Sequence, residues 1–337
     1  MKPRLPLASD PVTAAPTPSG LTRRQVLQVA TTLGLSASAV AAGLALSGRD
    51  TSAGRPPPAR LRDHRVPAAP GAVELAIARG PDAVENVRRA VEALGGMAAF
   101  VRPGDRVLIK PNVGWNRLPE QAANTQPDVV AQVVRMVRAA GAARVWVSDF
   151  PVNNPERCFE RSGIRAAVGG AGGDLVFPDG GSFRDVEVGG HVVPLAEMLW
   201  PLVEADKVIN LPVVKQHGLS LATLGMKNWY GVVGGHRARM HQAVHRAIVD
   251  LAACIRPTLT ILDGTRALVA NGPSGGSLDD VRRLDTVAAA VDPVALDAFG
   301  ASLLGLAPAE VAFIVEAEKA GLGRSDWRSL KTSEVGG

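Results

Sequence analysis

The chain has 337 residues, of which 46% are hydrophobic, 20% charged and 4% aromatic, and its formal net charge is +5. This length provides enough apolar material for one large domain or two small ones. Part of the positive charge lies near the N-terminus and no basic run has interleaved aromatic residues, so the composition argues against nucleic-acid binding.

The sequence contains two cysteines, Cys158 and Cys254. Two thiols cannot hold a four-cysteine iron–sulfur cluster or a cysteine-rich zinc site, so no iron–sulfur cluster is expected. In an exported protein the two could form one disulfide; two unpaired, buried thiols are at least as good an interpretation.

The N-terminal segment has the pattern of a twin-arginine export signal. Thr22 precedes the pair Arg23-Arg24, and the following stretch Val29–Leu46 carries no charge. Such a weakly hydrophobic stretch is typical of a signal peptide. We interpret residues 1–53 as a signal read by the twin-arginine export machinery, which places the protein in the periplasm or cell envelope. The alternative is an uncleaved anchor, which would then be the protein's contact with the membrane.

The segment after the signal differs sharply in composition. Residues 54–71 are rich in proline and arginine, which predicts an extended linker without packed elements. The folded α/β domain is expected over residues 72–325, and residues 326–337 are expected to form a C-terminal tail.

Short apolar, β-branched runs alternate with helical patterns along the rest of the chain. The predicted strands are Val73–Ala78, Arg106–Ile109, Arg144–Val147, Asp174–Phe177, Lys207–Leu211, Thr258–Leu262 and Thr286–Val291. The predicted helices are Ala83–Leu94, Pro127–Ala140, Met240–Cys254, Pro293–Leu304 and Pro308–Ala320. This alternation predicts a mainly parallel, mixed sheet with helices on both faces. The segment Val186–Val193 predicts a small inserted β-hairpin.

Polar residues follow several predicted strands at the point where each strand ends. Lys110 and Asn112 follow one strand, Ser148 and Asp149 follow a second, Asn210 lies near the end of a third, and Asp263 follows a fourth. Ligands of open parallel sheets bind beyond the carboxyl ends of the strands, so these residues indicate one crevice. Asn and Asp are also ordinary turn formers, whereas Lys is not, which gives more weight to Lys110 and to Lys215.

The densest polar stretch begins at Lys215 and His217 and continues through Lys227-Asn228. Histidines then recur at His236, His241 and His245. On the predicted helix, the last two lie one turn apart, within reach of a common metal or anion. A divalent metal is therefore a candidate cofactor, with a pair of half-buried boundary histidines as the alternative.

Two glycine-rich turns offer exposed backbone N–H groups. Gly234 and Gly235 belong to the first, and Gly272 to the second. Such turns favour anions, especially at a helix N-terminus, although a tight turn without a ligand is the more common explanation of either one alone. Neither matches a nucleotide-binding fingerprint.

Together these stretches resemble the domain-of-unknown-function 362 family of bacterial and archaeal proteins. The matching pieces are Lys110-Pro111-Asn112, Thr125 with Pro127, Asn210 through Lys215 and His217, Gly225, Lys227-Asn228, Gly231, Asp263-Gly264, Gly272-Pro273, Gly276, and Asp292 with Asp297. The resemblance spans roughly Val73 to Leu306. It implies a polar crevice and no firmly assigned reaction. Many relatives carry a ferredoxin-like module, which this chain lacks.

Three functions fit these observations. In the first, an enzyme, Lys110, Lys215 and Lys227 bind a small phosphate or carboxylate substrate, with ligand contacts from Asn112, Asn210 and Asn228. His217 or His241 then acts as a base or metal ligand, and Asp263 orients it or completes a metal site. The second is a non-catalytic binding or accessory protein for an anion or metal. The third is a purely structural polar network.

Overall fold

The computed structural model describes residues 56–67 and 69–336, so the predicted export signal lies outside the described residues. From Pro57 onward the chain forms one compact unit. Within the described residues, no helix is both long and apolar enough to cross a membrane.

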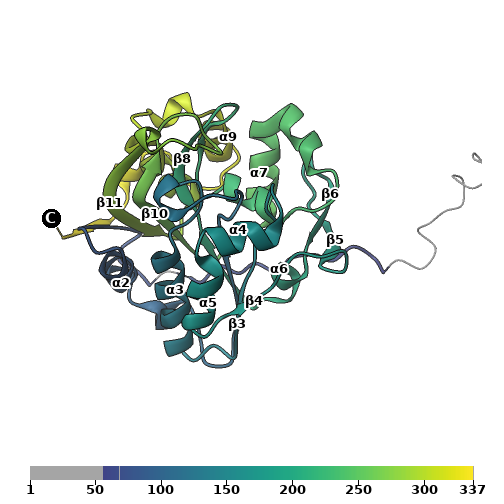
Figure 1. Ribbon diagram of the computed structural model, residues 1–337, viewed down its shortest axis with the longest axis horizontal. Helices are drawn as coiled ribbons and strands as arrows, with labels where there is room; N and C mark the ends of the chain where they lie inside the picture. Colours follow the sequence, from purple (N-terminus) through teal and green to yellow (C-terminus); the bar gives the residue numbers. More distant parts are fainter. Residues whose placement is uncertain (1–55, 68, 337) are drawn as a thin grey trace, which may run out of the picture. The chain divides into compact units, whose positions relative to one another are not determined.

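A ten-stranded sheet organises this unit (Figure 1). Its main path runs β12–β1–β11–β10–β7–β2–β3–β4, and β8 and β9 branch from β10. Strands β10, β7, β2, β3 and β4 are parallel, whereas β11 runs against both of its neighbours. The strands are β1 (Leu75–Arg79), β2 (Arg106–Pro111), β3 (Arg144–Val147), β4 (Asp174–Leu175), β7 (Lys207–Leu211), β8 (Val213–His217), β9 (Leu221–Thr223), β10 (Leu259–Leu268), β11 (Val281–Ala290) and β12 (Thr332–Val335).

Two hydrophobic layers cover the two faces of the sheet. Alternate residues of β2 point to opposite sides, so that Val107 and Ile109 join one layer and Leu108 joins the other. The first layer contains α2 (Ala83–Ala93), α3 (Pro127–Ala139), α4 (Pro155–Arg161) and α5 (Ile164–Gly170). The second contains α6 (Trp200–Glu204), α7 (Val244–Cys254), α8 (Pro293–Leu303) and α9 (Ala312–Lys319). The predicted mainly parallel sheet with helices on both faces is confirmed.

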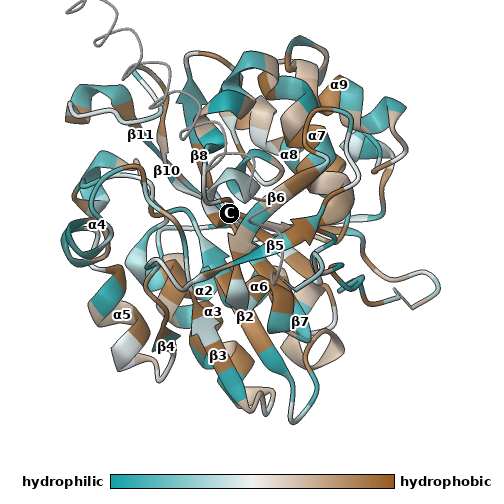
Figure 2. Ribbon diagram, turned by 90° about the vertical axis from the view of Figure 1, so that its right-hand side faces the viewer, coloured by the Kyte–Doolittle hydropathy of each residue, from teal (hydrophilic) through white to brown (hydrophobic). Residues whose placement is uncertain are grey.

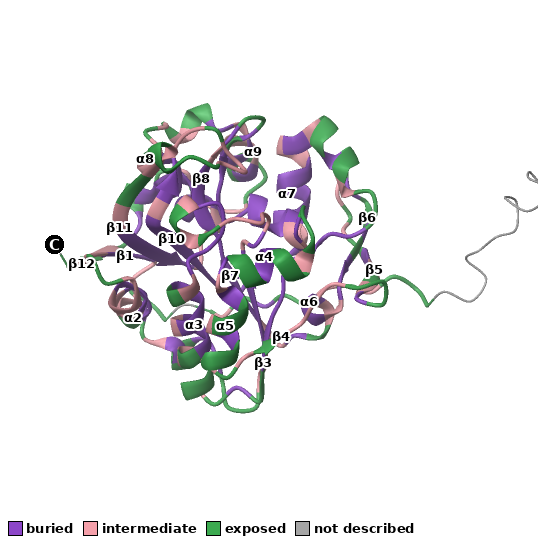
Figure 3. Cartoon of the chain, in the orientation of Figure 1, coloured by how far each residue is buried: buried purple, intermediate pink, exposed green. Residues whose placement is uncertain are grey.

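Hydrophobic residues run along the central strands (Figure 2), and these strands are buried while the outward sides of α4 and α5 are exposed (Figure 3). Both faces of the sheet are covered, and so its central strands are apolar almost throughout. A polar side chain in such a strand therefore indicates a special environment.

The predicted hairpin is present, with different strand boundaries. β5 (Phe183–Glu187) pairs antiparallel with β6 (Leu195–Leu199) as a separate two-stranded sheet. Asp250 of α7 accepts hydrogen bonds from Val192 N at 2.7 Å and Val193 N at 3.0 Å. A helix carboxylate thus fixes the connection between the two strands.

Both ends of the folded unit differ from the sequence-based boundaries. The expected tail instead supplies β12, which pairs in parallel with β1, and Trp327 and Leu330 join the core. In the expected linker, Ala59 forms a bridge with Val186, and His64 is buried. The composition of these two segments indicated chain without packed elements. The C-terminal segment nevertheless packs because β1 offers an open strand edge, and the N-terminal segment packs through a few of its side chains.

The helix predicted from Met240 begins four residues later. A 3-10 helix, η4 (Arg237–Ala243), precedes α7, and Ala243 has a non-helical φ of −135°. Both cysteines are free: Cys158 is buried and Cys254 is half-buried.

Candidate functional site

A cavity of about 410 Å³ lies beyond the carboxyl ends of β2, β3 and β8. It brings together side chains from segments more than a hundred residues apart. Eight of the residues predicted for the crevice line this cavity: Lys110, Asn112, Lys215, His217, Lys227, Asn228, His241 and Gly272.

A buried ion pair forms the floor of the cavity. Lys110 Nζ lies 2.8 Å from Asp149 Oδ1, and the two side chains are 0% and 2% exposed. Asp149 Oδ2 also accepts a hydrogen bond from Val113 N at 2.6 Å. The pKa of Lys110 lies below its ordinary value because burial and the charge of Arg237 lower it by more than the neighbouring carboxylate of Asp149 raises it. The pair places its two charges at the ends of adjacent parallel strands.

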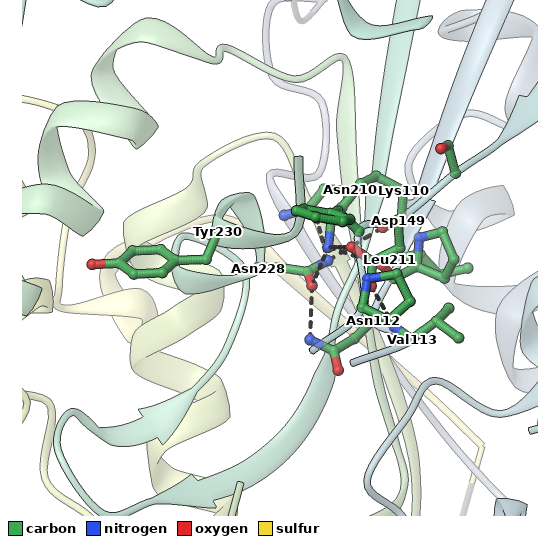
Figure 4. A network of polar contacts seen from close by, with 12 residues as sticks. Lys110, Asn112, Val113, Asp149, Asn210, Leu211, Asn228 and Tyr230 are labelled. Atoms are coloured by element: carbon green, nitrogen blue, oxygen red, sulfur yellow. Dashed lines mark hydrogen bonds and ion pairs between the residues drawn. The ribbon is translucent and has the colours of Figure 1, made fainter. Parts of the chain in front are cut away.

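Three asparagines extend this ion pair into a network (Figure 4). Asn228 Oδ1 accepts from Lys110 Nζ at 2.7 Å and from Asn112 Nδ2 at 2.9 Å. Asn228 Nδ2 donates to Asn210 Oδ1 at 2.8 Å. Asn210 in turn holds Gly225 O through its Nδ2 at 2.9 Å. The network joins β2 and β7 to η3 (Lys227–Val232), and Tyr230 points away from it.

Gly231 allows η3 to pass directly over the ion pair. A Cβ at this position would overlap Asp149 Oδ1 and would lie 2.6 Å from Lys110 Nζ. Gly231 O also accepts a hydrogen bond from Phe150 N at 2.6 Å. The backbone of η3 therefore closes one side of the cavity only because residue 231 has no side chain.

Lys215 reaches the cavity from β8. Its Nζ donates to Asn112 Oδ1 at 2.9 Å and to Ala123 O at 2.6 Å. Burial, followed by the positive charges of Lys227 and Lys110, lowers the pKa of Lys215 to about 7, despite the opposing effect of Asp149. Its amine therefore exchanges a proton near neutral pH while two neutral oxygens hold it in place.

Lys227 is the cation in this cavity that has the fewest partners. Its side chain is 6% exposed, and Nζ lies 4.6 Å from the centre of the Tyr230 ring. Within the described chain, no carboxylate pairs with it. Burial and the charge of Arg237 lower the pKa of Lys227 to about 8.

Arg237 adds a second positive charge beside Lys227. Its guanidinium lies 4.3 Å from the centre of the Phe150 ring and donates to Phe150 O at 2.5 Å and Pro151 O at 2.7 Å. Neutral carbonyl oxygens hold this guanidinium, so its charge remains available to an anion in the cavity.

His217 presents a neutral ring to the cavity. Its Nδ1 accepts hydrogen bonds from Leu219 N at 3.1 Å and Ser220 N at 3.4 Å. Burial and the charges of Lys227 and Lys215 lower the pKa of His217 to about 3. With its Nδ1 lone pair occupied, the neutral ring carries its proton on Nε2, and His217 acts as a hydrogen-bond donor. The role of proton-accepting base expected from the sequence does not fit this geometry.

Asp297 of α8 fixes the turn that precedes Lys227. Its carboxylate accepts from Gly225 N at 2.6 Å and Met226 N at 2.9 Å. Asp297 is fully buried, and burial raises its pKa to about 7. It contributes to the site through backbone geometry, without lining the cavity.

Several residues predicted for the site lie outside the cavity. Asp263 is fully buried and accepts from Gln126 N at 2.8 Å and from Thr265 N and Oγ1 at 3.0 and 2.7 Å. It therefore fixes loops and does not orient a histidine. Gly234 packs against Phe183, and Gly235 lies near Glu197.

The three-histidine metal site expected from the sequence does not form. His241 lies on η4 beside Tyr230, while His245 lies on α7 and stacks on Phe313. His236 does not line the cavity. Among the described residues, no group of three or more His, Cys, Asp and Glu side chains is arranged to hold a metal ion. The break before α7 removes the one-turn spacing that suggested the site.

Asp149, Arg237 and Tyr230 also line the cavity, although the sequence analysis assigned none of them a catalytic or binding role. The strand-end pattern did indicate Asp149, which follows β3 as Lys110 ends β2. Arg237 and Tyr230 gave no comparable signal, because the path of η3 and η4 decides where they lie.

The fold and site define an α/β protein with a lysine-lined crevice at the carboxyl edge of its parallel strands. The chain belongs to the family described as Domain of unknown function (DUF362), whose model matches residues 107–302. It is 34% identical over 247 residues to a thylakoid-associated protein of Synechocystis sp., covering 70% of this chain and 74% of that protein.

Among solved structures, the lactate racemase apoprotein of Thermoanaerobacterium thermosaccharolyticum superposes with a TM-score of 0.41 at 14% identity. The superposition covers 72% of this chain and 58% of the length of that one.

Proposed function

We propose that this protein is an enzyme that binds a small phosphate- or carboxylate-bearing molecule in the cavity and transfers a proton to or from it through Lys215. The observation that carries the proposal is the excess of buried positive charge. Lys215, Lys227 and Arg237 face a cavity whose carboxylate, Asp149, is already paired with Lys110.

Charge balance supports anion binding. Burying an unpaired ammonium group is costly, and an anionic ligand removes that cost by pairing with it. Lys227 Nζ and the Nε2–H of His217 supply donors that no carboxylate of the described chain occupies. An anion between them would have two directed hydrogen bonds in a site of low dielectric, where charge-assisted bonds are strong.

The geometry of Lys215 supports the proton transfer. As a neutral amine, Lys215 keeps two N–H groups for Asn112 Oδ1 and Ala123 O, and its lone pair takes the third position. On accepting a proton from the ligand, the amine becomes an ammonium group with three N–H donors, and the third donor points to the ligand. A pKa of about 7 suits both directions of this transfer at neutral pH.

A deuterium experiment tests the proposal. Mature protein is recovered from the cell envelope, and any retained small molecule is released, identified by mass spectrometry and returned to the protein in D₂O. We expect the wild type to introduce deuterium into the molecule or to convert it, while Lys215→Met binds it without either change. Binding by both proteins with no chemical change would instead favour the second candidate, a non-catalytic binding protein, for which Lys227 and His217 suffice.

We further propose that the protein acts outside the cytoplasm after export in the folded state. The Arg23-Arg24 pair and the uncharged stretch after it support this, and so does the similarity to the thylakoid-associated protein of Synechocystis. Twin-arginine export would carry the assembled crevice across the membrane intact.

A further inference from the structure

The walls of the cavity differ in character from its floor. The Lys110–Asp149 pair forms the floor, whereas six of the other lining residues are aromatic or aliphatic. These are Trp115, Phe150, Val152, Leu219, Tyr230 and Pro273. A site built only for inorganic phosphate or a free small acid would have no use for so much apolar surface.

The size of the cavity leads to the same conclusion. A water molecule accounts for about 30 Å³ of liquid, so 410 Å³ corresponds to the liquid volume of about 14 waters. A carboxylate or phosphate group fills only a small share of that space. The cavity falls within the range of roughly 300–1,000 Å³ that is usual for sites of organic ligands.

Two apolar residues of the cavity wall remain exposed to solvent. Val152 is 61% exposed and Leu219 is 60% exposed, and both line the same cavity. Single exposed apolar residues are common on protein surfaces, but here two of them continue an apolar wall that begins inside the cavity. They would be covered by a ligand that extends from the floor outward.

The polar end of such a ligand has a defined place. Thr223 Oγ1 is buried and has no hydrogen-bond partner among the described residues, and Thr223 lines the cavity with His217 and Lys227. A buried hydroxyl without a partner is unusual and is satisfied when a ligand oxygen reaches it.

We propose that the ligand is an amphiphilic anion. Its phosphate or carboxylate head contacts Lys227, His217 and Thr223, and its apolar body lies along Trp115, Val152 and Leu219. This inference rests on the proposed anion site and specifies the class of molecule that it takes.

A chain-length series tests the inference. Dissociation constants of the full mature protein are measured by calorimetry for inorganic phosphate, acetate, and n-alkyl phosphates and n-alkyl carboxylates of two to ten carbons. We expect each added methylene to tighten binding about two- to fourfold until the alkyl chain passes the exposed residues. The two head groups distinguish a phosphate ligand from a carboxylate ligand.

Matched variants locate the effect. Leu219→Asn and Val152→Asn should abolish most of the chain-length gain while leaving the affinity for inorganic phosphate unchanged, and because both side chains are exposed, folding should be preserved. Leu195→Asn is the control, since Leu195 is 50% exposed on β6 and does not line the cavity.

The outcomes separate this inference from the proposed function. Binding of phosphate or acetate that depends on Lys227 but gains nothing from longer chains would overturn the amphiphile and leave the anion site intact. No binding of any anion in the series would overturn both.

Discussion

Lys110 Nζ and Asp149 Oδ1 lie 2.8 Å apart, fully buried, at the carboxyl ends of the adjacent parallel strands β2 and β3. Removal of one partner from a buried ion pair leaves an uncompensated charge, which typically costs about 3–5 kcal/mol. We expect Asp149→Asn to lower the free energy of unfolding by about this amount in urea denaturation.

The double variant Lys110→Met with Asp149→Asn provides the control, because no buried charge is then left alone. We expect it to be more stable than Asp149→Asn by about 1 kcal/mol or more. Equal stability of the single and double variants would show that the two charges are not coupled.

Lys215 should make stability depend on pH above neutrality. Its pKa is about 7 in the native protein against 10.5 for a free lysine, so the unfolded chain binds more protons between these values. The free energy of unfolding should therefore rise from pH 7 to about pH 10, by at most about 1.4 kcal/mol per pH unit for this group. Lys215→Met should remove that part of the slope. A slope identical to the wild type would contradict a depressed pKa at Lys215.

Lys227 should control anion affinity with little effect on folding. We expect Lys227→Met to weaken phosphate binding at least tenfold at pH 7 while leaving the melting temperature unchanged or slightly higher, because a buried, unpaired ammonium group is removed. Wild-type affinity should also fall above pH 8, where Lys227 loses its proton. Lys319→Met, at an exposed site on α9, is the control for loss of one positive charge.

His217 should remain neutral with its proton on Nε2 throughout the physiological range. Nitrogen-15 NMR of the imidazole should show this tautomer down to pH 5, because two backbone N–H groups occupy Nδ1 and the pKa lies near 3. His217→Ala should weaken phosphate binding by about 1.5–3 kcal/mol through loss of a hydrogen bond to a charged group. Titration of the ring between pH 6 and 7 would contradict the geometry.

Asp297 should act through the position of Lys227. Asp297→Asn keeps the size of the side chain but leaves one of the two N–H groups, Gly225 or Met226, without a full acceptor, at a cost of about 1–3 kcal/mol. We expect lower stability and a parallel loss of phosphate affinity. Rescue of affinity by Asp297→Glu would support a positioning role, whereas lower stability with unchanged affinity would confine Asp297 to the core.

The proposed export would depend on residues outside the described part of the chain. Replacement of Arg23 and Arg24 by lysines should prevent the protein from reaching the envelope fraction. Immunoblotting of fractionated cells measures this. The control is the Lys319→Met variant, which keeps both arginines and should be exported normally. Unimpaired export of the lysine variant would refute the twin-arginine assignment.

The sequence by itself determined the positions of most central strands and the lysines of the crevice. Strands such as Arg144–Val147 and Lys207–Leu211 are short apolar runs whose period and flanking helices are local properties, and they lie where the sequence predicts. The carboxyl ends of parallel strands meet at one edge, so Lys110 and Lys215 could be assigned to one crevice, and the dense polar stretch after Lys215 added Lys227.

The tertiary structure alone decided which polar residues belong to that crevice and what each does there. A one-turn spacing predicted His241 and His245 on one helix face, but the helix begins only at Val244. Asp263 follows a predicted strand as Asp149 does, yet in the structure it lies within β10 and its oxygens accept hydrogen bonds from Gln126 and Thr265. Which polar side chains face the cavity depends on the path of the loops and on the burial of each charge. These are properties of contacts between distant segments, which local sequence patterns do not encode.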